Sequence, residues 1–277
     1  MDLHLLQRLV LPPIRNVIAL ALILVATMAA GPRDVLSRAK RLYNGAQYGA
    51  AIDAARDAAK TPALADAARL VMARAYLERF RQNANDADKD AARDALKQVR
   101  VTALSGDDRV ELLIALGESL YFDGQAGAAA EQFELALATA DRKQPVRRER
   151  LLDWWATALD RQAQSAAEGL ARSLQARIVR RMEDELHGDA GATVASYWLA
   201  AAARGTGDIE RAWNAAIAGW VRISQLGQKG AGARGELDAL VTQAIIPDRA
   251  RLISPASPDA AAASMRSQWE ALKKAWS

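Results

Sequence analysis

The chain contains no cysteine, only two histidines among its 277 residues, and 5% aromatic residues. The missing cysteines exclude disulfides, thiolate metal sites and cysteine nucleophiles. Of the histidines, His4 lies in an N-terminal apolar segment, and His187 lies where a helix is expected to end, where histidine interacts favourably with the helix dipole. No HExxH, GxSxG or P-loop motif occurs. We therefore expect a protein that is not an enzyme and that uses neither a metal site nor a cofactor.

Strong charge of one sign is also lacking. The chain has 37 basic and 33 acidic residues, which gives a formal net charge of +4. Both signs are interspersed along the sequence, and no basic face emerges of the kind that binds nucleic acid. Nucleic acid is therefore not an expected partner.

Three glycines, Gly230, Gly232 and Gly235, have the spacing of a dinucleotide-binding fingerprint. That fingerprint requires a strand before the first glycine. Here the apolar residues on both sides recur every three or four positions, which predicts helices instead. We interpret the segment as a loop between two helices, with Lys229 and Arg234 as candidate anion contacts beside the free backbone N–H groups of the following helix.

The N-terminal residues 1–30 have the composition of a targeting or anchoring segment. An uncharged apolar run from Asn16 to Ala30 follows Arg8 and Arg15. This pattern predicts either a cleaved signal peptide or, if residues 9–30 remain, a membrane attachment. Basic residues also follow the run, so charge does not settle its orientation. Either interpretation places the protein in the periplasm or elsewhere in a bacterial cell envelope.

A helical repeat with small residues at fixed positions runs through residues 31–253. In its clearest copy, Gly117 lies on a first helix and Ala129, Phe133 and Ala136 on a second, with a glycine-containing turn between them. Ala39 and Ala73 occupy the position of Gly117 in earlier copies, and they are 34 residues apart. Weaker copies follow around Ala156 and Ala200.

These motifs resemble the tetratricopeptide repeat (TPR), in which small residues mark the contact between paired helices. The resemblance implies an all-α fold, a right-handed α-solenoid of about five TPR-like helix pairs. Residues 254–277 are predicted to be a Pro/Ser linker and a capping helix, in which Met265, Trp269, Leu272 and Trp276 share one face. A non-repeating helical bundle is the alternative.

An aspartate-rich insertion interrupts the second copy. Asp86, Asp88 and Asp90 have the spacing that begins a calcium loop, but the required glycine and glutamate are replaced by Ala91 and Lys97. We interpret the segment as a polar loop, with Asp90 capping a helix from Ala91 to Arg100.

The resemblance also implies a concave groove lined by the first helix of each pair. The residues expected to face it are Leu36, Lys40, Tyr43, Leu70, Arg74, Leu77, Ile114, Glu118, Tyr121, Tyr197 and Arg204. Their mixture of aromatic, apolar and charged side chains suits a peptide or protein segment. The Lys/Asn set that clamps a C-terminal carboxylate in chaperone-binding relatives is absent, so that activity is not expected.

The sequence thus predicts a non-enzymatic scaffold or adaptor that binds a protein or peptide partner in its groove. The alternative is a helical domain that binds a glycan or another small ligand. In that case a tryptophan-rich surface would provide the stacking platforms, from Trp154, Trp155, Trp198, Trp213 and Trp220.

Overall fold

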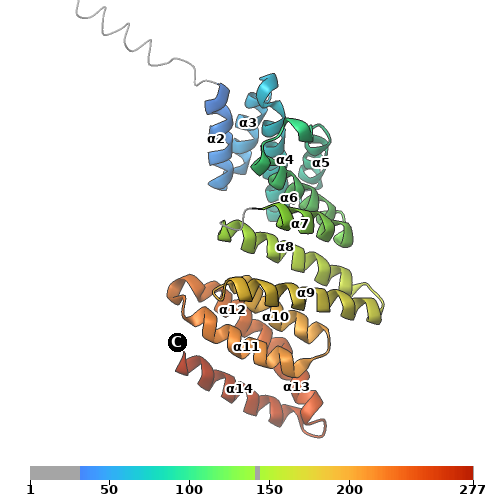
Figure 1. Ribbon diagram of the computed structural model, residues 1–277, viewed down its shortest axis with the longest axis vertical. Helices are drawn as coiled ribbons and strands as arrows, with labels where there is room; N and C mark the ends of the chain where they lie inside the picture. The colour runs from blue at the N-terminus through green and yellow to red at the C-terminus, as the bar shows by residue number, and fades with distance from the viewer. Residues whose placement is uncertain (1–31, 141–143, 277) are drawn as a thin grey trace, which may run out of the picture.

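The computed structural model describes residues 32–140 and 144–276, and within these ranges all regular structure is helical, with no strand. The prediction of an all-α fold is confirmed. The helices follow one another along the long axis of the molecule, from α2 at one end to α14 at the other (Figure 1). None of the described helices is long and apolar enough to cross a membrane. The predicted signal peptide or anchor, residues 1–30, lies outside the described residues.

Helices that are neighbours in the chain pack against each other, as in a helical repeat protein. The ten helices of the predicted pairs are α2 (Pro32–Asn44), α3 (Tyr48–Ala58), α4 (Ala65–Asn83), α5 (Asp86–Lys97), α6 (Gly106–Phe122), α7 (Ala126–Thr139), α8 (Pro145–Gln164), α9 (Glu168–Gly188), α10 (Thr193–Gly205) and α11 (Ile209–Ser224). The arrangement fits a helical solenoid. The handedness and the number of TPR-like repeats remain predictions.

Small residues lie where the paired helices touch, as the repeat pattern predicts. Ala39, Ala73 and Gly117 are buried in α2, α4 and α6. Gly117 shows why the position must be small: a Cβ atom there would lie 2.6 Å from the ring of Phe133 in α7, which is fully buried. Close approach of the helix backbones therefore depends on the absence of a side chain.

The aspartate-rich insertion is helical rather than a loop, so the sequence interpretation was wrong at this point. α5 begins at Asp86, and the Asn85 side chain accepts a hydrogen bond from the Ala87 N–H as its N-cap. Asp88 is buried and pairs with Arg79 of α4. An asparagine cap and an interhelical ion pair therefore start this helix earlier than Asp90, which pairs with Arg93 one turn further along.

The glycine-rich segment after α11 joins two helices, as predicted. Gly227–Gly230 forms a short 3₁₀ turn, and α12 (Ala231–Leu240) follows it. A Cβ atom on Gly230 would lie 2.5 Å from the Ile223 carbonyl oxygen, so glycine permits this close return to α11.

After α12 the chain stays helical through Pro247. A π-helical turn (Val241–Ile245) leads directly into α13 (Ile246–Ile253). Pro247 occupies the first turn of α13, a position where its missing N–H is tolerated.

The C-terminal helix α14 (Pro258–Ala275) packs its apolar face against the end of the helical stack. Met265 and Trp269 are buried, and the Trp269 ring lies 5.3 Å from that of Trp220 in α11. The indole N–H of Trp269 donates to Asp238 of α12 at 2.6 Å. Trp276, expected on the same face, is 43% exposed because it lies beyond the end of the helix.

Candidate functional site

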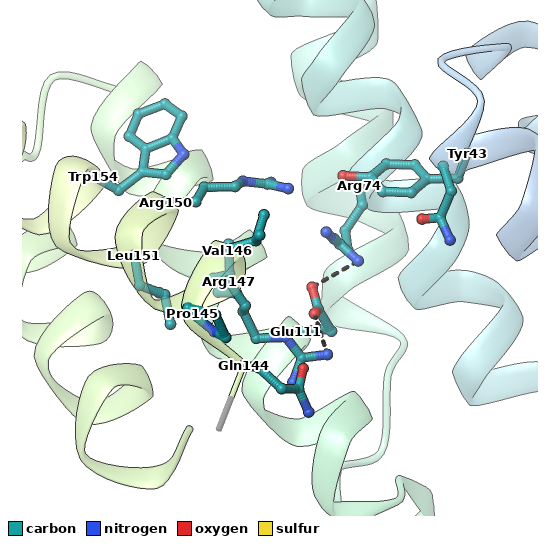
Figure 2. A pocket seen from close by; sticks show the side chains of 12 residues that line it. Tyr43, Arg74, Glu111, Gln144, Pro145, Val146, Arg147, Arg150, Leu151 and Trp154 are labelled. Atoms are coloured by element: carbon teal, nitrogen blue, oxygen red, sulfur yellow. Dashed lines mark ion pairs between the residues drawn. The ribbon is translucent and has the colours of Figure 1, made fainter. Parts of the chain in front are cut away.

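A hollow lies between α8 and the helices α4 and α6, and it extends to the end of α2. Its central pocket has a volume of about 400 Å³ and is lined by Tyr43, Asn44, Arg74, Glu111, Ile114, Gln144, Pro145, Val146, Arg147, Arg150, Leu151 and Trp154 (Figure 2). These residues come from α2, α4, α6, α8 and the residue that precedes α8. The pocket therefore combines the first helices of four successive predicted pairs.

Two further pockets adjoin the central one, and we refer to the three together as the groove. The pocket on one side, of about 250 Å³, shares Tyr43, Arg74 and Arg147 with the centre and adds Lys40 and Asp108, among others. The pocket on the other side, of about 580 Å³, shares Arg150 and Trp154 and adds the side chains of Tyr48, Glu78, Arg81, Tyr121, Phe122, Asp153 and Thr157. The groove is thus continuous along α2, α4, α6 and α8, and Tyr48 of α3 adds to one end of it.

The helical repeat itself places these side chains. Ala39, Ala73 and Gly117 turn toward the second helix of each pair, where they are buried. The residue that directly follows each of them is rotated by roughly 100° about the helix axis and therefore faces a different side of the first helix. Lys40, Arg74 and Glu118 each follow one of these small residues directly, which brings three charged side chains from three helices to the groove.

A chain of ion pairs crosses the centre of the groove. Glu111 of α6 binds Arg74 of α4 at 2.6 Å and Arg147 of α8 at 3.1 Å, so one carboxylate holds two guanidinium groups from different helices (Figure 2). Arg147 also reaches Asp107 at 3.2 Å. The Arg74 guanidinium lies 4.4 Å from the ring centroid of Tyr43, a cation–π contact.

A second ionic cluster lines one end of the groove and extends beneath it to Glu118. Arg150 of α8 binds Glu118 of α6 at 3.1 Å and Glu78 of α4 at 3.5 Å. Glu78 also accepts from Arg81 at 2.5 Å and lies 3.5 Å from the Tyr43 hydroxyl. The cluster ties α8 to α4 and α6, whereas the close packing of α8 is with α7 and α9.

Burial sets the pKa values in this cluster. Burial raises the pKa of Glu118, although Arg150 and Arg74 partly offset the effect. Burial also raises the pKa of Tyr43, against the influence of Arg74. For Arg150, burial opposes the charged form, but Glu118 and Tyr43 outweigh it and raise its pKa above the ordinary value. Arg150 therefore stays cationic over the whole physiological range.

An aromatic wall closes the other side of the groove. The Trp154 ring stacks on Phe133 at 5.6 Å and meets the rings of Tyr121 and Phe122 edge-on at 5.4 and 5.9 Å. In Figure 2, the Arg150 side chain extends from Trp154 toward Tyr43 and Arg74. Val146, at the rim, is 83% exposed. The wall and rim offer apolar surface next to charged groups.

Most of the predicted groove residues come together at this place. The residues that line the groove are Lys40, Tyr43, Leu70, Arg74, Ile114 and Tyr121, and Glu118 lies beneath it. Leu77 is instead buried in the core between α4 and α5, and Leu36 packs against the core of α2 and α3.

The two predicted groove residues of α10 do not join this group. Arg204 binds Asp248 at 2.6 Å, and Tyr197 packs edge-on against Trp198. Both lie outside the three pockets that form the groove.

The contribution of α8 was missed by sequence reasoning. Arg147 and Arg150 were not predicted, because the repeat around Ala156 matches the pattern poorly. Trp154 was predicted only as part of the alternative tryptophan-rich surface and not as a groove residue. The signal was nevertheless present. In the other copies, groove residues lie three positions before and one position after the small residue. Around Ala156 these positions are Asp153 and Thr157, and both line the groove.

The candidate anion contacts lie far along the chain from the groove. Arg234 donates to the Gly227 carbonyl oxygen at 2.9 Å and thereby closes the glycine-rich turn, while Lys229 is exposed. Anion binding by this pair remains a prediction. His187, by contrast, has the predicted place: its Nδ1 lies 2.7 Å from the Glu183 carbonyl oxygen in the last turn of α9.

Four of the five tryptophans proposed as a stacking surface are buried, and each has a structural role. Trp155, Trp198, Trp213 and Trp220 are 1–8% exposed. The Trp198 N–H donates to Asp153 at 2.9 Å. Of the five, Trp154 is the one whose ring reaches the groove.

The groove thus offers guanidinium donors, an aromatic wall and an apolar rim, an arrangement suited to holding an extended segment of another molecule. Comparison with protein-family models, curated proteins and solved structures finds no match for the chain.

Proposed function

We propose that the protein is a non-enzymatic scaffold or adaptor that binds a segment of a protein partner in the groove. The observation that carries this proposal is the continuity of the groove across α2, α4, α6 and α8. An extended segment is long enough to contact all four helices, whereas a small metabolite fills a single pocket. The mixed apolar and charged lining matches the composition of protein interfaces, in which aromatic residues and arginine are enriched.

The proposal includes the finer architecture and the location. The paired helices would form a right-handed solenoid of about five TPR-like repeats, whose concave side is the groove. The N-terminal residues 1–30 would direct the protein to a bacterial cell envelope, as a cleaved signal or as an attachment through residues 9–30. Fractionation of cells that produce the full chain, with mass measurement of its N-terminus, tests this location and whether the segment is removed.

Site-specific photo-cross-linking tests partner binding. A photoreactive amino acid at Val146 places the probe at the exposed rim of the central pocket. The matched control carries it at Ser267, on the exposed face of α14. We expect a discrete adduct with one protein from position 146 and none from position 267. Equal labelling from both positions, or no adduct from position 146, would contradict the proposal.

A further inference from the structure

In three ion pairs of the groove, the acidic side chain is more buried and the basic side chain is more exposed. The side chain of Lys40 is 44% exposed and that of its partner Asp108 is 17% exposed. On the opposite side, Arg81 is 56% exposed over Glu78 at 8%. Arg150 is 41% exposed over Glu118 at 3%. At these three places the surface that a partner meets is cationic, although each pair is neutral.

The central pocket holds more cations than carboxylates, although the side chains of Arg74 and Glu111 are about equally buried, at 13% and 15% exposed. Three arginines line it, Arg74, Arg147 and Arg150, against one carboxylate, that of Glu111. Glu111 is 15% exposed, and its oxygens are already directed at Arg74 and Arg147. Guanidinium groups keep further N–H donors for a second acceptor, because each carries five.

Two carboxylates at the margins do not follow this order. Asp107 is 72% exposed and pairs with the less exposed Arg147. It lies in the first turn of α6, at the edge of the groove, where an acid is favoured by the helix dipole. Asp153 accepts the indole N–H of Trp198, which holds it toward α10.

From this arrangement we infer that the groove is specific for an acidic partner segment that carries a large apolar side chain between its acidic residues. The inference rests on the proposed function and names the chemistry of its partner. Carboxylates of the segment bind the exposed faces of Lys40, Arg147 and Arg150. The apolar side chain enters the central pocket, between Trp154 and Val146. Charge-assisted hydrogen bonds of this kind are about twice as strong as neutral ones.

Peptide binding tests the inference with the full chain. The probe is a short, fluorescein-labelled peptide with one Phe flanked on both sides by Glu, amidated so that no terminal carboxylate contributes. Its counterparts replace Glu by Gln, Glu by Lys, or Phe by Ala. Fluorescence anisotropy measures each dissociation constant at low and at physiological ionic strength. We expect the Gln peptide to bind at least about tenfold more weakly, which corresponds to about 1.4 kcal/mol, and the Glu peptide to lose affinity as salt rises.

Two variants connect the binding to the groove. Lys40→Gln with Arg147→Gln removes two cations that line the groove, of which Lys40 is the more exposed. Arg150→Gln with Glu118→Gln removes a cation together with its buried partner, so that no unpaired carboxylate is left in the interior. We expect each double variant to weaken binding of the Glu peptide by about tenfold or more, the loss expected for one or two charge-assisted hydrogen bonds. Arg180→Gln with Arg266→Gln, on exposed faces of α9 and α14, is the control and is expected to bind like the parent.

The outcomes separate this inference from the proposed function. Equal binding of the Glu and Gln peptides, or undiminished binding by both groove variants, overturns the acidic specificity. If no peptide binds but the adduct at position 146 persists, the specificity is wrong and partner binding stands. Absence of the adduct at position 146 contradicts the proposed function itself. A single-stranded oligonucleotide that displaces the Glu peptide and binds more tightly would also overturn the inference, since the partner would then be a nucleic acid.

Discussion

Gly117 and Glu118 are neighbours in α6, and they serve opposite sides of that helix. Gly117 receives the ring of Phe133 from α7, and Glu118 holds a buried carboxylate under the groove. The first position maintains the contact within a helix pair, and the second connects α6 to α8. Two adjacent residues therefore join α6 to both of the helices that follow it.

Replacing Gly117 with alanine tests the contact within the pair. The added Cβ atom would meet the buried Phe133 ring, and overpacking of this kind costs about 1–3 kcal/mol. Alanine is the better helix former by about 1 kcal/mol, which offsets part of the loss. The control, Gly235→Ala in α12, adds a Cβ atom in open space and should stabilise the protein. Urea unfolding is expected to separate the two variants by about 2 kcal/mol, and equal stabilities would contradict the packing argument.

Replacing Glu118 with glutamine tests how the buried carboxylate makes the stability of the protein depend on pH. The pKa of Glu118 is raised in the folded protein, so the folded state binds more protons than the unfolded state between the two pKa values. The contribution of this group to stability is complete below its unfolded pKa and is lost as pH rises through the raised one. We expect parent and Glu118→Gln to converge at about pH 4, and the variant to gain relative stability toward about pH 8.

Urea unfolding across this pH range measures the difference. Glu236→Gln, an exposed change on α12, controls for the altered net charge. A difference between parent and Glu118→Gln that does not depend on pH would show that the carboxylate is not desolvated.

The sequence predicted which small residues lie at helix contacts better than it predicted which charged residues pair between helices. Small residues at a fixed spacing identified Gly117 and Ala73 correctly, because the repeat is local information. The ion pairs were not predicted, since Arg150 and Glu118 are 32 residues apart. Whether such a pair forms depends on how two helices approach each other, and spacing along one helix does not contain that information.

At the scale of the element, α14 covers the end of the helical stack. Its inner face places Trp269 against Trp220, while its outer face is formed largely by alanine, serine and charged residues. An open end of a helical stack exposes apolar surface, which a terminal helix of this kind removes from water.

Substituting each of the two tryptophans of this C-terminal segment compares the stability loss at a buried position with that at an exposed one. Trp269→Ala removes a fully buried ring and its hydrogen bond to Asp238, so we expect a loss of about 3–5 kcal/mol. Trp276→Ala, at an exposed position just after α14, should cost less than about 1 kcal/mol. Chemical unfolding of both variants gives the comparison. Similar losses would mean that α14 does not cap the stack through Trp269.

Element boundaries were predictable only where local chemistry decides them. The predicted capping helix, α14, begins at Pro258, because proline is suited to the first helical turn. The start of α5 was misplaced, since the interhelical ion pair of Asp88 extends the helix toward Asn85. The π turn before Pro247 was missed as well, because packing against neighbouring helices keeps the chain helical there.

At the scale of the whole molecule, the described residues form three apolar clusters of unequal size. The largest runs from α6 to α14, a second lies between α4, α5 and α6, and the smallest joins α2, α3 and α4. Helix α6 contributes buried residues to the two larger clusters, with Ile114 in one and Ala115 in the other. In a stack of this kind, stability is close to a sum over neighbouring units.

Hydrogen exchange should follow this division. We expect the amides of α2 and α3 to exchange fastest, because they belong to the smallest cluster and lie at one end of the stack. Those of α8, α10 and α11 should exchange slowest, within the largest cluster. Peptide-resolved mass spectrometry measures both. Uniform protection along the chain would indicate a single cooperative unit instead.

The pairing of Arg150 with the buried Glu118 has a consequence for how the sequence can change over time. Loss of Arg150 alone leaves the buried Glu118 carboxylate without its ion-pair partner, at a cost of about 3–5 kcal/mol, whereas joint replacement of the two by apolar residues of similar volume is close to neutral. Arg150 is therefore expected to be replaced only together with Glu118. Across related chains, paired replacement at positions 118 and 150 would mark those whose groove lacks this cation.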